Sequence, residues 1–360
     1  MSSLQNFTYT SKTPRVVFGS GSISSITAEL SSLSCSRPLI LCTPRQTRLA
    51  QLVDFHLTEF FADIYSHATK HTPKSITNNA IDFAKSHRVD AVISIGGGST
   101  IGLGKACAYH GGFKHICIPT TYSGSEVTPI LGETIDGVKT TRSDPAIVPD
   151  TVIYDVDLTL TLPPQVSAYS GINAIAHAVE ALYGQGKNPV ITLLATEAIR
   201  VLANALPEIV ADPLNKDARS KALYGAWLCG YCLGSVGMSI HHKLCHALGG
   251  SFGLPHAETH TAILPHALAY NAPAVPEAMA ILAKVFPDSN GDAIHGLDLL
   301  LDRLKVGRAL RDLGMEEEDI EKGVDIATDN VYPNPRPVTI IGTHRIIRRA
   351  WAGEPATADI

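Results

Sequence analysis

The sequence predicts an α/β domain with a parallel sheet, followed by an all-helical domain. Within residues 1–162, short apolar or β-branched runs such as Pro38–Cys42 and Ala91–Ile95 alternate with helical segments. Such runs, bounded by turn residues and separated by helices, are typical of a parallel sheet built from strand–helix–strand units. After Pro163 the β-branched runs become scarce, and apolar residues recur with helical spacing. We therefore predict two domains, residues 1–162 and residues 163–360.

The individual elements follow from these patterns. In the first domain we predict a helix at Ser75–Ser86 and strands at Arg15–Phe18, Pro38–Cys42, Ala91–Ile95, His115–Ile118 and Val152–Tyr154. In the second we predict a loop at Tyr332–Pro337 and helices at Gln165–Tyr183, Asn188–Leu206, Asp217–Ser235, Ser239–Gly249 and Ala257–Tyr270. The alternating residues of Phe7–Phe18 predict a hairpin. Because a lone hairpin is marginal in water and has an exposed edge, we expect it to pair with a second copy in a homodimer.

Composition excludes several classes of protein. The 360 residues are 45% hydrophobic and 18% charged, which argues against disorder. The 29 basic and 34 acidic residues give a net charge of −5, so nucleic acid is not an expected partner. We find no apolar run of the ~18 residues that a membrane span needs, and no apolar core of a signal peptide at the start. Seven scattered cysteines indicate reduced thiols, and we expect a cytoplasmic protein.

A glycine-rich loop follows the strand predicted at Ala91–Ile95. Gly96, Gly97 and Gly98 lead into Ser99 at the expected start of a helix. Glycine lets a backbone approach a phosphate closely, and a helix N-terminus supplies free N–H groups and positive potential. Ser99 can cap the helix and bond a phosphate oxygen. The same pattern also suits a tight strand-to-helix turn that binds nothing.

A second polar loop follows the next strand and contains Thr120, Thr121 and Ser125. Both loops lie at the carboxyl edge of the predicted sheet, where open α/β folds bind ligands, so together they favour a nucleotide. No acidic residue follows the second strand to hold a ribose 2′-hydroxyl; Arg45 there can accept a 2′-phosphate or simply face solvent. We therefore expect both NADH and NADPH to bind, and we include Lys139 among the candidate cofactor-binding residues.

Histidines recur with helical spacing in the second domain. Asn173, His177 and Glu180 stand at i, i+4 and i+7, so they share one face of a predicted helix. His242 and His246 are likewise one turn apart on a later helix. Imidazoles on separate helices suit either a metal site or a proton relay.

His256 begins a third helix and extends this constellation. A catalytic divalent metal usually has a carboxylate among its ligands, but the suitable position carries Asn173. A neutral amide lowers the expected affinity for a metal, and it repels an anionic substrate less than a carboxylate would.

The order of these segments resembles the iron-containing alcohol dehydrogenase superfamily, and within it the maleylacetate reductase subfamily. The strings that carry the resemblance are GGGS at 96–99, IPTTYSGSE at 118–126, GINAIAHAVEALYG at 171–184, GMSIHHKLCHALGGSFGLPHAETH at 237–260, YPNPRP at 332–337 and RAWAGEP at 349–355. The resemblance implies a Rossmann-like N-terminal domain, a helical C-terminal domain of the dehydroquinate synthase-like architecture, and an active site in the cleft between them. It also implies reduction of the carbon–carbon double bond of maleylacetate to give 3-oxoadipate, with NADH or NADPH, in the catabolism of aromatic compounds.

The resemblance also implies site residues. In metal-dependent relatives an aspartate and three histidines bind iron or zinc, and the matching residues here are Asn173, His177, His242 and His256. This substitution implies a vestigial site without a tightly bound metal. The candidate catalytic residues are those four, His246, which matches an additional active-site histidine, and Lys243.

Among these candidates, His242 and His246 can stabilise the enolate that forms on a dianionic substrate and supply its proton. Lys243 either meets a substrate carboxylate or points to solvent. The alternatives are a metal-dependent alcohol or aldehyde oxidoreductase of the same superfamily, and a redox-inactive biosynthetic relative.

Overall fold

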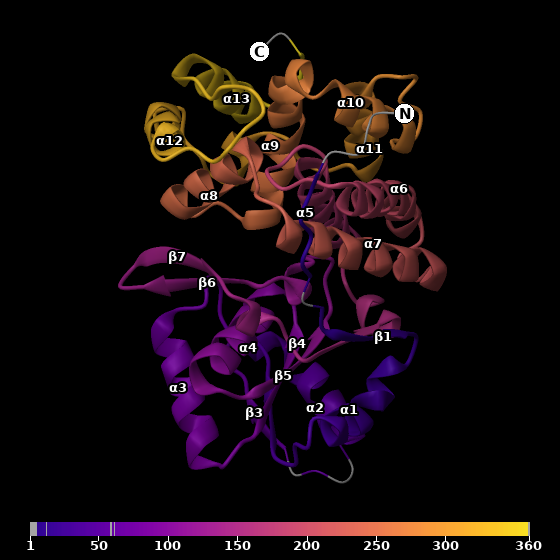
Figure 1. Cartoon of the computed structure of the whole chain (residues 1–360), viewed down its shortest axis with the longest axis vertical. Coiled ribbons are helices and arrows are strands. Elements are labelled where there is room, and N and C mark those ends of the chain that lie inside the picture. The colour runs from indigo at the N-terminus through magenta and orange to yellow at the C-terminus, as the bar shows by residue number, and fades with distance from the viewer. Residues whose placement is uncertain (1–5, 12, 58–59, 61, 359–360) are drawn as a thin grey trace. The chain divides into compact units, whose positions relative to one another are not determined.

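The computed structural model describes residues 6–11, 13–57, 60 and 62–358, and these form two compact units (Figure 1). The described residues of 11–162 form an α/β unit, and those of 163–358 form a helical unit that also includes residues 6–10. The change from α/β to helical structure falls where the sequence predicts it. The segment that ends at Thr10, in contrast, groups with the helical unit and not with the sheet.

The α/β unit contains a six-stranded parallel sheet in the order β1-β8-β5-β4-β2-β3. The strands are β1 (Arg15–Gly19), β2 (Pro38–Leu41), β3 (Asp63–Tyr65), β4 (Ala91–Gly96), β5 (Lys114–Pro119) and β8 (Thr151–Asp155). Every residue of β2, β4 and β8 is buried, as expected for parallel strands that are covered on both faces. The five predicted strands are confirmed, whereas the short strand β3 was not predicted.

Helices cover both faces of this sheet, with α1 and α2 on one face and α3 and α4 on the other (Figure 1). Their bounds are Ile26–Ser32, Thr47–His56, Lys74–Ser86 and Gly98–Gly111. Ile40 and Ile93 pack with the first pair of helices, and their neighbours Leu39 and Val92 pack with the second pair. Successive side chains of a strand point to opposite faces, so both neighbours in such an apolar run are buried.

The antiparallel hairpin of the α/β unit is formed by β6 (Ile130–Ile135) and β7 (Val138–Ser143), not by the N-terminal residues. The hairpin predicted at Phe7–Phe18 is wrong: residues 7–11 contain no strand, Lys12 lies outside the described residues, and β1 pairs in parallel with β8. The β-branched residues of β1 extend the large sheet, which buries them better than a separate hairpin would.

The helical unit contains nine α-helices in its described part. They are α5 (Pro164–Ala181), α6 (Pro189–Ala211), α7 (Lys216–Ser235), α8 (Ile240–Phe252), α9 (His256–Asn271), α10 (Pro276–Val285), α11 (Ala293–Leu304), α12 (Asp319–Thr328) and α13 (Ile340–Ala352). The five predicted helices correspond to α5–α9, and Tyr332–Pro337 is a loop as predicted. Sequence analysis did not identify α10–α13.

Helix α6 is long and apolar enough to cross a membrane by length and composition, contrary to our expectation that no such run is present. It packs against α5 and α7, however, and half of its apolar window is buried in the unit. Glycines make this packing close: a Cβ at Gly171 would lie 2.5 Å from Leu206, and one at Gly225 would lie 2.8 Å from Leu202. These contacts identify α6 as a core helix of its unit.

Candidate active site

The predicted glycine-rich turn connects β4 to α4. A Cβ at Gly96 would lie 2.7 Å from both Gln46 Oε1 and Thr100 Oγ1, and the φ of Gly96 is +149°, so only glycine suits this position. Helix α4 begins at Gly98, with Gly97 as the N-cap residue and no side chain capping it. Ser99 is therefore the second residue of the helix, and the prediction that it caps the helix is wrong.

The start of α4 nevertheless has the features of an anion site. The first N–H groups of a helix have no partner within the helix. Gly98 is exposed, and nothing lies within 4 Å of a Cβ built there, so a bulky group can approach the backbone. This open approach fits the pyrophosphate of a dinucleotide.

The second polar loop lies against the first, as predicted. The N–H of Thr120 donates to the Gly96 carbonyl at 3.0 Å. The methyl group of Thr121 is 3.1 Å from the Cβ position of Gly97. Thr120 is buried, whereas Thr121 and Ser125 are half-buried, and Ser125 begins the short turn that follows.

A buried lysine that sequence analysis missed fixes the second loop. The Lys105 ammonium, on α4, donates to the Ser125 carbonyl at 2.5 Å and to the Thr128 carbonyl at 2.8 Å. It also donates to the Thr128 hydroxyl at 2.9 Å and to the Ile130 carbonyl at 3.0 Å. Burial lowers the pKa of Lys105 to about 8. A lysine within an otherwise apolar helix is the signal that could have identified it.

The other predicted cofactor residues lie at the surface. Arg45 is exposed in the turn after β2, and the neighbouring Gln46 is the residue that meets the glycine loop. Lys139 lies on β7, whose six residues are all exposed.

The predicted histidine constellation comes together in the helical unit. Asn173 and His177 are buried on α5, His242 is buried on α8, and His246 on α8 is half-buried. The ring centroids of His177 and His242 are 5.1 Å apart, and those of His242 and His246 are 6.0 Å apart. His256 opens α9 but is exposed.

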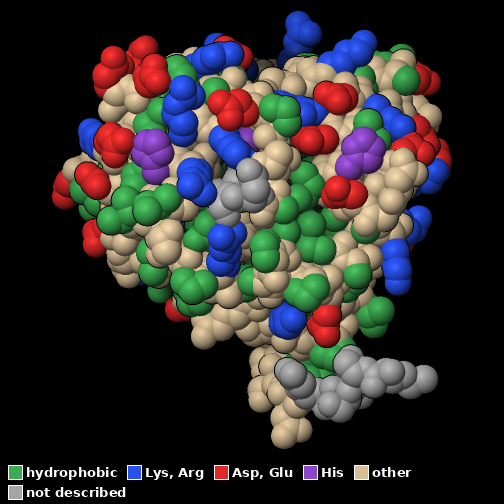
Figure 2. Space-filling model, turned by 90° about the horizontal axis from the view of Figure 1, so that it is seen from above, with side chains coloured by type: hydrophobic (Ala, Val, Ile, Leu, Met, Phe, Trp, Pro, Cys, Tyr) green, Lys and Arg blue, Asp and Glu red, His purple; other side chains and the backbone are tan. Residues whose placement is uncertain are grey.

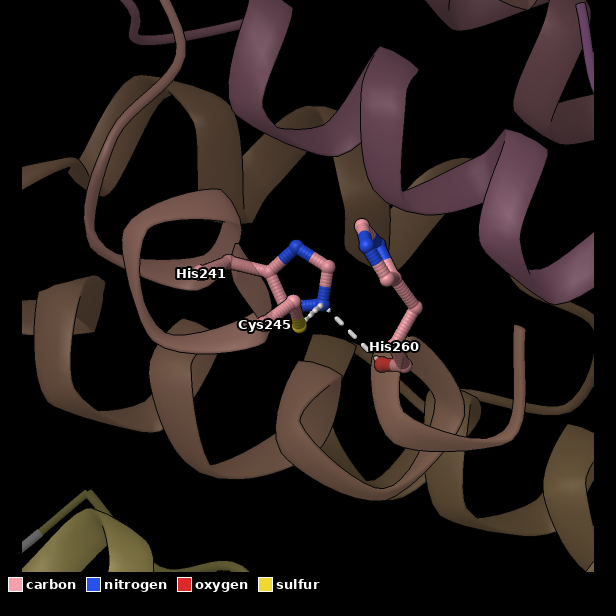
Figure 3. A group of neighbouring side chains, drawn as sticks. All are labelled: His241, Cys245 and His260. Carbon is pink, nitrogen blue, oxygen red and sulfur yellow. Dashed lines mark hydrogen bonds between the residues drawn. The ribbon is translucent and has the colours of Figure 1, made fainter. Parts of the chain in front are cut away.

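Two further histidines, His241 and His260, belong to this cluster and were not predicted (Figure 3). Both are fully buried. The His260 ring lies 4.9 Å from His241, 5.0 Å from His242 and 4.2 Å from His256, measured between centroids. A signal was available: His260 follows His256 by four residues, so the two share a helix face.

Glu180 connects the cluster to the backbone of α8. Its fully buried carboxylate accepts the His242 Nδ1–H at 2.7 Å, and it also accepts the backbone N–H groups of Ser239 at 2.9 Å and His241 at 2.8 Å. Burial alone would raise the pKa of Glu180, but the hydrogen bond from His242, the adjacent histidines and the backbone N–H groups hold it below its ordinary value. Glu180 thus caps α8 and orients the imidazole of His242.

Several buried polar atoms of the cluster have no hydrogen-bond partner among the described residues. They are Asn173 Oδ1, His177 Nδ1, His242 Nε2 and both ring nitrogens of His260. Burial and the neighbouring histidines hold the pKa values of His177 and His260 well below the ordinary histidine value. Since unpaired buried polar groups are costly, the cluster is suited to a polar ligand or ordered water.

Lys243 is not directed into this cluster. Its ammonium donates to the Asp329 carbonyl at 2.7 Å and lies 5.8 Å from the centre of the Tyr332 ring. Of the two predicted orientations of Lys243, the structure does not show the one toward a substrate carboxylate in this cluster, because its charge is held by the loop after α12. The hydroxyl of Tyr332 lies 3.3 Å from His246 Nδ1, a contact that sequence analysis missed.

The helical unit contains donor groups that could hold a metal ion, although several of their atoms already make hydrogen bonds. In the part of the chain that is described, two groups of three donors come within 4.8 Å of one another: His241, Cys245 and His260, and Glu180, His241 and His242. His241 Nε2 already donates to the His260 carbonyl at 3.0 Å, and the Glu180 oxygens accept the hydrogen bonds given above. The set implied by metal-dependent relatives is not among these groups, and Asn173 supplies an amide where a carboxylate would stand.

Charged side chains of both signs lie on the surface of the helical unit. On the face that Figure 2 draws, acidic and basic side chains are interspersed. Ion pairs in α11–α13 and the flanking segments include Arg308–Asp298, Arg348–Glu317 and Arg349–Glu354.

Comparison with known proteins gives matches along almost the whole chain. Residues 13–156 match the family model "Iron-containing alcohol dehydrogenase", and residues 167–351 match the model of the C-terminal part of the Fe-containing alcohol dehydrogenase family. A maleylacetate reductase of Rhizobium sp. (strain MTP-10005) is 47% identical over 350 residues, which cover 97% of this chain and 99% of the relative.

Solved structures agree with these matches. The maleylacetate reductase of Agrobacterium tumefaciens has a TM-score of 0.94 and 45% identity, and the match covers 98% of this chain and 100% of that one. A putative alcohol dehydrogenase of Ralstonia eutropha JMP134 has a TM-score of 0.95 and 48% identity, with 98% and 99% covered.

The role of Glu180 predicts a large loss of stability in Glu180→Gln. An amide has one acceptor oxygen where the carboxylate has two, so buried donors lose a partner, and we expect a free energy of unfolding lower by about 3 kcal/mol in urea titration at pH 7. The folded-state pKa of Glu180 lies below its ordinary value of 4.5. The difference in the free energy of unfolding between variant and wild type is therefore complete above pH 4.5. It shrinks as pH falls through the folded-state pKa, because the wild-type carboxyl then becomes neutral as well.

A matched control is Glu197→Gln, because Glu197 lies on α6 in a partly exposed pair with Arg200. Its loss should be below about 0.5 kcal/mol. Equal losses in the two variants would contradict the role given to Glu180.

Proposed function

Since this chain belongs to the iron-containing alcohol dehydrogenase family, we propose that it is a maleylacetate reductase, which reduces the carbon–carbon double bond of maleylacetate to give 3-oxoadipate. The observation that carries the proposal is the buried histidine cluster with an amide at position 173, within a chain nearly half identical to maleylacetate reductases along its length. The reaction serves the catabolism of aromatic compounds.

The helical unit supplies the polar groups for this reaction. Maleylacetate is a dianion with a keto group conjugated to its double bond, so negative charge develops on the keto oxygen when hydride reaches the alkene. Because His242 Nδ1 is bonded to Glu180, its unpartnered Nε2 is available to that oxygen. His246, bonded to Tyr332 at its other nitrogen, is the second candidate proton donor.

The α/β unit supplies the nucleotide site. Bound NADH or NADPH provides the hydride. Gly96–Ser99, Thr120, Thr121 and Ser125 are the residues that would hold its pyrophosphate, with the N-terminus of α4 facing the negative charge. The exposed Arg45 and the absence of an acid in residues 43–46 support the use of both nucleotides.

We also propose that catalysis does not depend on a tightly held metal. Asn173 leaves the site without the anionic ligand of metal-dependent relatives, and it reduces repulsion of a dianionic substrate. A metal-dependent alcohol or aldehyde oxidoreductase is the second candidate, which the match to a putative alcohol dehydrogenase favours.

One assay tests the reaction. We expect purified protein to oxidise NADH and NADPH in the presence of maleylacetate, with a rate that survives extensive treatment with a chelator. Loss of activity in chelator, restored by zinc or iron, would favour the metal-dependent alternative. Failure to bind either nucleotide would indicate a redox-inactive relative.

The open approach to Gly98 predicts an effect confined to the nucleotide. In Gly98→Val the added side chain meets no protein atom within 4 Å of its Cβ but occupies the approach to the α4 N-terminus. We expect the KM for NADH to rise more than tenfold while the melting temperature stays near that of wild type. Gly250→Val, at another open helical position, is the control and should leave that KM unchanged.

Asn173→Asp tests the role of the amide. The carboxylate should raise affinity for zinc in calorimetric titration, because it adds a full charge beside the histidines. At an effective dielectric constant of ~20, two like charges about 6 Å apart repel by roughly 3 kcal/mol, and a third of this would weaken maleylacetate binding about fivefold in chelator. An unchanged substrate KM and no gain of metal affinity would refute this reading of Asn173.

We further propose a cytoplasmic homodimer. The free, buried thiols support the compartment. Strand β1 lies at the edge of the sheet and Phe18 on it is exposed, and an edge of this kind favours pairing with a second chain. Light scattering at micromolar concentration should give twice the mass of the chain, and the mass of one chain would contradict the proposal.

A further inference from the structure

His260 lies at the centre of the histidine cluster, beside the two candidate proton donors His242 and His246. It is fully buried in the second turn of α9, and both of its ring nitrogens lack a hydrogen-bond partner among the described residues. Its backbone, in contrast, is held in place, because the carbonyl of His260 accepts the Nε2–H of His241 at 3.0 Å. Figure 3 shows this bond reaching the carbonyl oxygen and not the ring.

The His260 ring offers two nitrogens to a ligand, and neither bonds to a described residue. An uncharged imidazole has one N–H donor and one acceptor nitrogen. Leaving both unpaired in a buried site is costly, so the ring is suited to a polar ligand.

His242 offers a second unpaired nitrogen beside it. The two ring centroids are 5.0 Å apart and the rings are inclined at 81°. Two nitrogens that each bond to one oxygen at about 2.9 Å can be separated by up to about 5.8 Å, so neighbouring rings can share an oxygen when a nitrogen of each faces it. Because Glu180 fixes the Nδ1 side of His242, its Nε2 side is the one left for that oxygen.

We propose that His260 is a substrate-binding residue, which donates a hydrogen bond to the same substrate oxygen that His242 Nε2 contacts. The inference rests on the proposed function and deepens it: the oxygen is the keto oxygen of maleylacetate, on which charge develops. His242, paired with Glu180, supplies the proton, and His260 supplies a second hydrogen bond to the oxygen. Substrates that lack an oxygen at this position leave both nitrogens unpaired, and so they bind poorly.

The alternative use of His260 is a soft-metal site with His241 and Cys245. Their donor atoms come within 4.8 Å of one another, but His241 Nε2 is occupied by the His260 carbonyl. Burial raises the pKa of the Cys245 thiol well above its ordinary value, which disfavours the thiolate that a metal needs. The geometry therefore favours a substrate oxygen.

The experiment compares His260→Phe with His266→Phe, using maleylacetate and NADH. His266 is a matched control, because it is a buried, uncharged histidine on the same helix and lies outside the cluster. We expect His260→Phe to lower kcat/KM for maleylacetate by at least 30-fold with the KM for NADH unchanged. His260→Gln keeps a donor and an acceptor. The decrease in the logarithm of its kcat/KM should therefore be smaller than that of His260→Phe by at least a third.

The control variant His266→Phe should keep kcat/KM for maleylacetate within threefold of wild type. The melting temperatures of all three variants show whether each is folded. The inference is overturned if folded His260→Phe stays within threefold of wild type, if His260→Gln recovers nothing, or if His266→Phe loses as much. Wild-type protein that does not turn over maleylacetate would overturn the proposed function and this inference with it. If the wild-type protein turns over maleylacetate and His260→Phe does so equally well, the inference about His260 is overturned while the proposed function stands.

Discussion

The site in the helical unit depends on one buried carboxylate. Glu180 sits on α5, yet its hydrogen bonds go to the first backbone N–H groups of α8 and to the side chain of His242. A carboxylate at a helix N-terminus is favoured by the helix dipole, so the cost of burying its charge is offset by three donors and the dipole together. The same contacts fix the position of α8, on which His241, His242 and His246 stand. Without this charge, α8 would lose the acceptor at its N-terminus, and His242 would lose the hydrogen bond that orients its ring.

The strands and the histidine pairs were predictable from periodicity, because both follow from repeating geometry. Apolar runs such as Ala91–Ile95 are buried on both faces, and the i, i+4 spacing of His242 and His246 places them on one side of a helix. The boundary near Pro163 followed from the loss of β-branched runs. The short strand β3 lacks enough residues to carry a pattern of its own, and β7 is exposed throughout, so neither has an apolar signal.

Contacts between distant residues could not be predicted. Lys105 binds oxygens 20 to 25 residues away, and Lys243 binds a carbonyl 86 residues away. A pattern within one helix shows neither destination, and so the sequence suggested a role for Lys243 and none for Lys105. The predicted hairpin at Phe7–Phe18 failed for the same reason, since the partner of β1 is the distant strand β8. The spacing of His260 from His256 places both on one face of α9, but it does not show that His260 meets His241 and His242 of α8.

The burial of the seven free cysteines determines which molecules of this protein oxidants can modify. Every one is buried, and burial raises the pKa of each thiol. Oxidants and alkylating agents react with exposed thiolates, so folded molecules present almost none to them. A molecule that opens exposes these thiols and can be modified before it closes again. Oxidative chemistry would then remove the opened molecules selectively, and the rate of thiol labelling would report how often the folded chain opens.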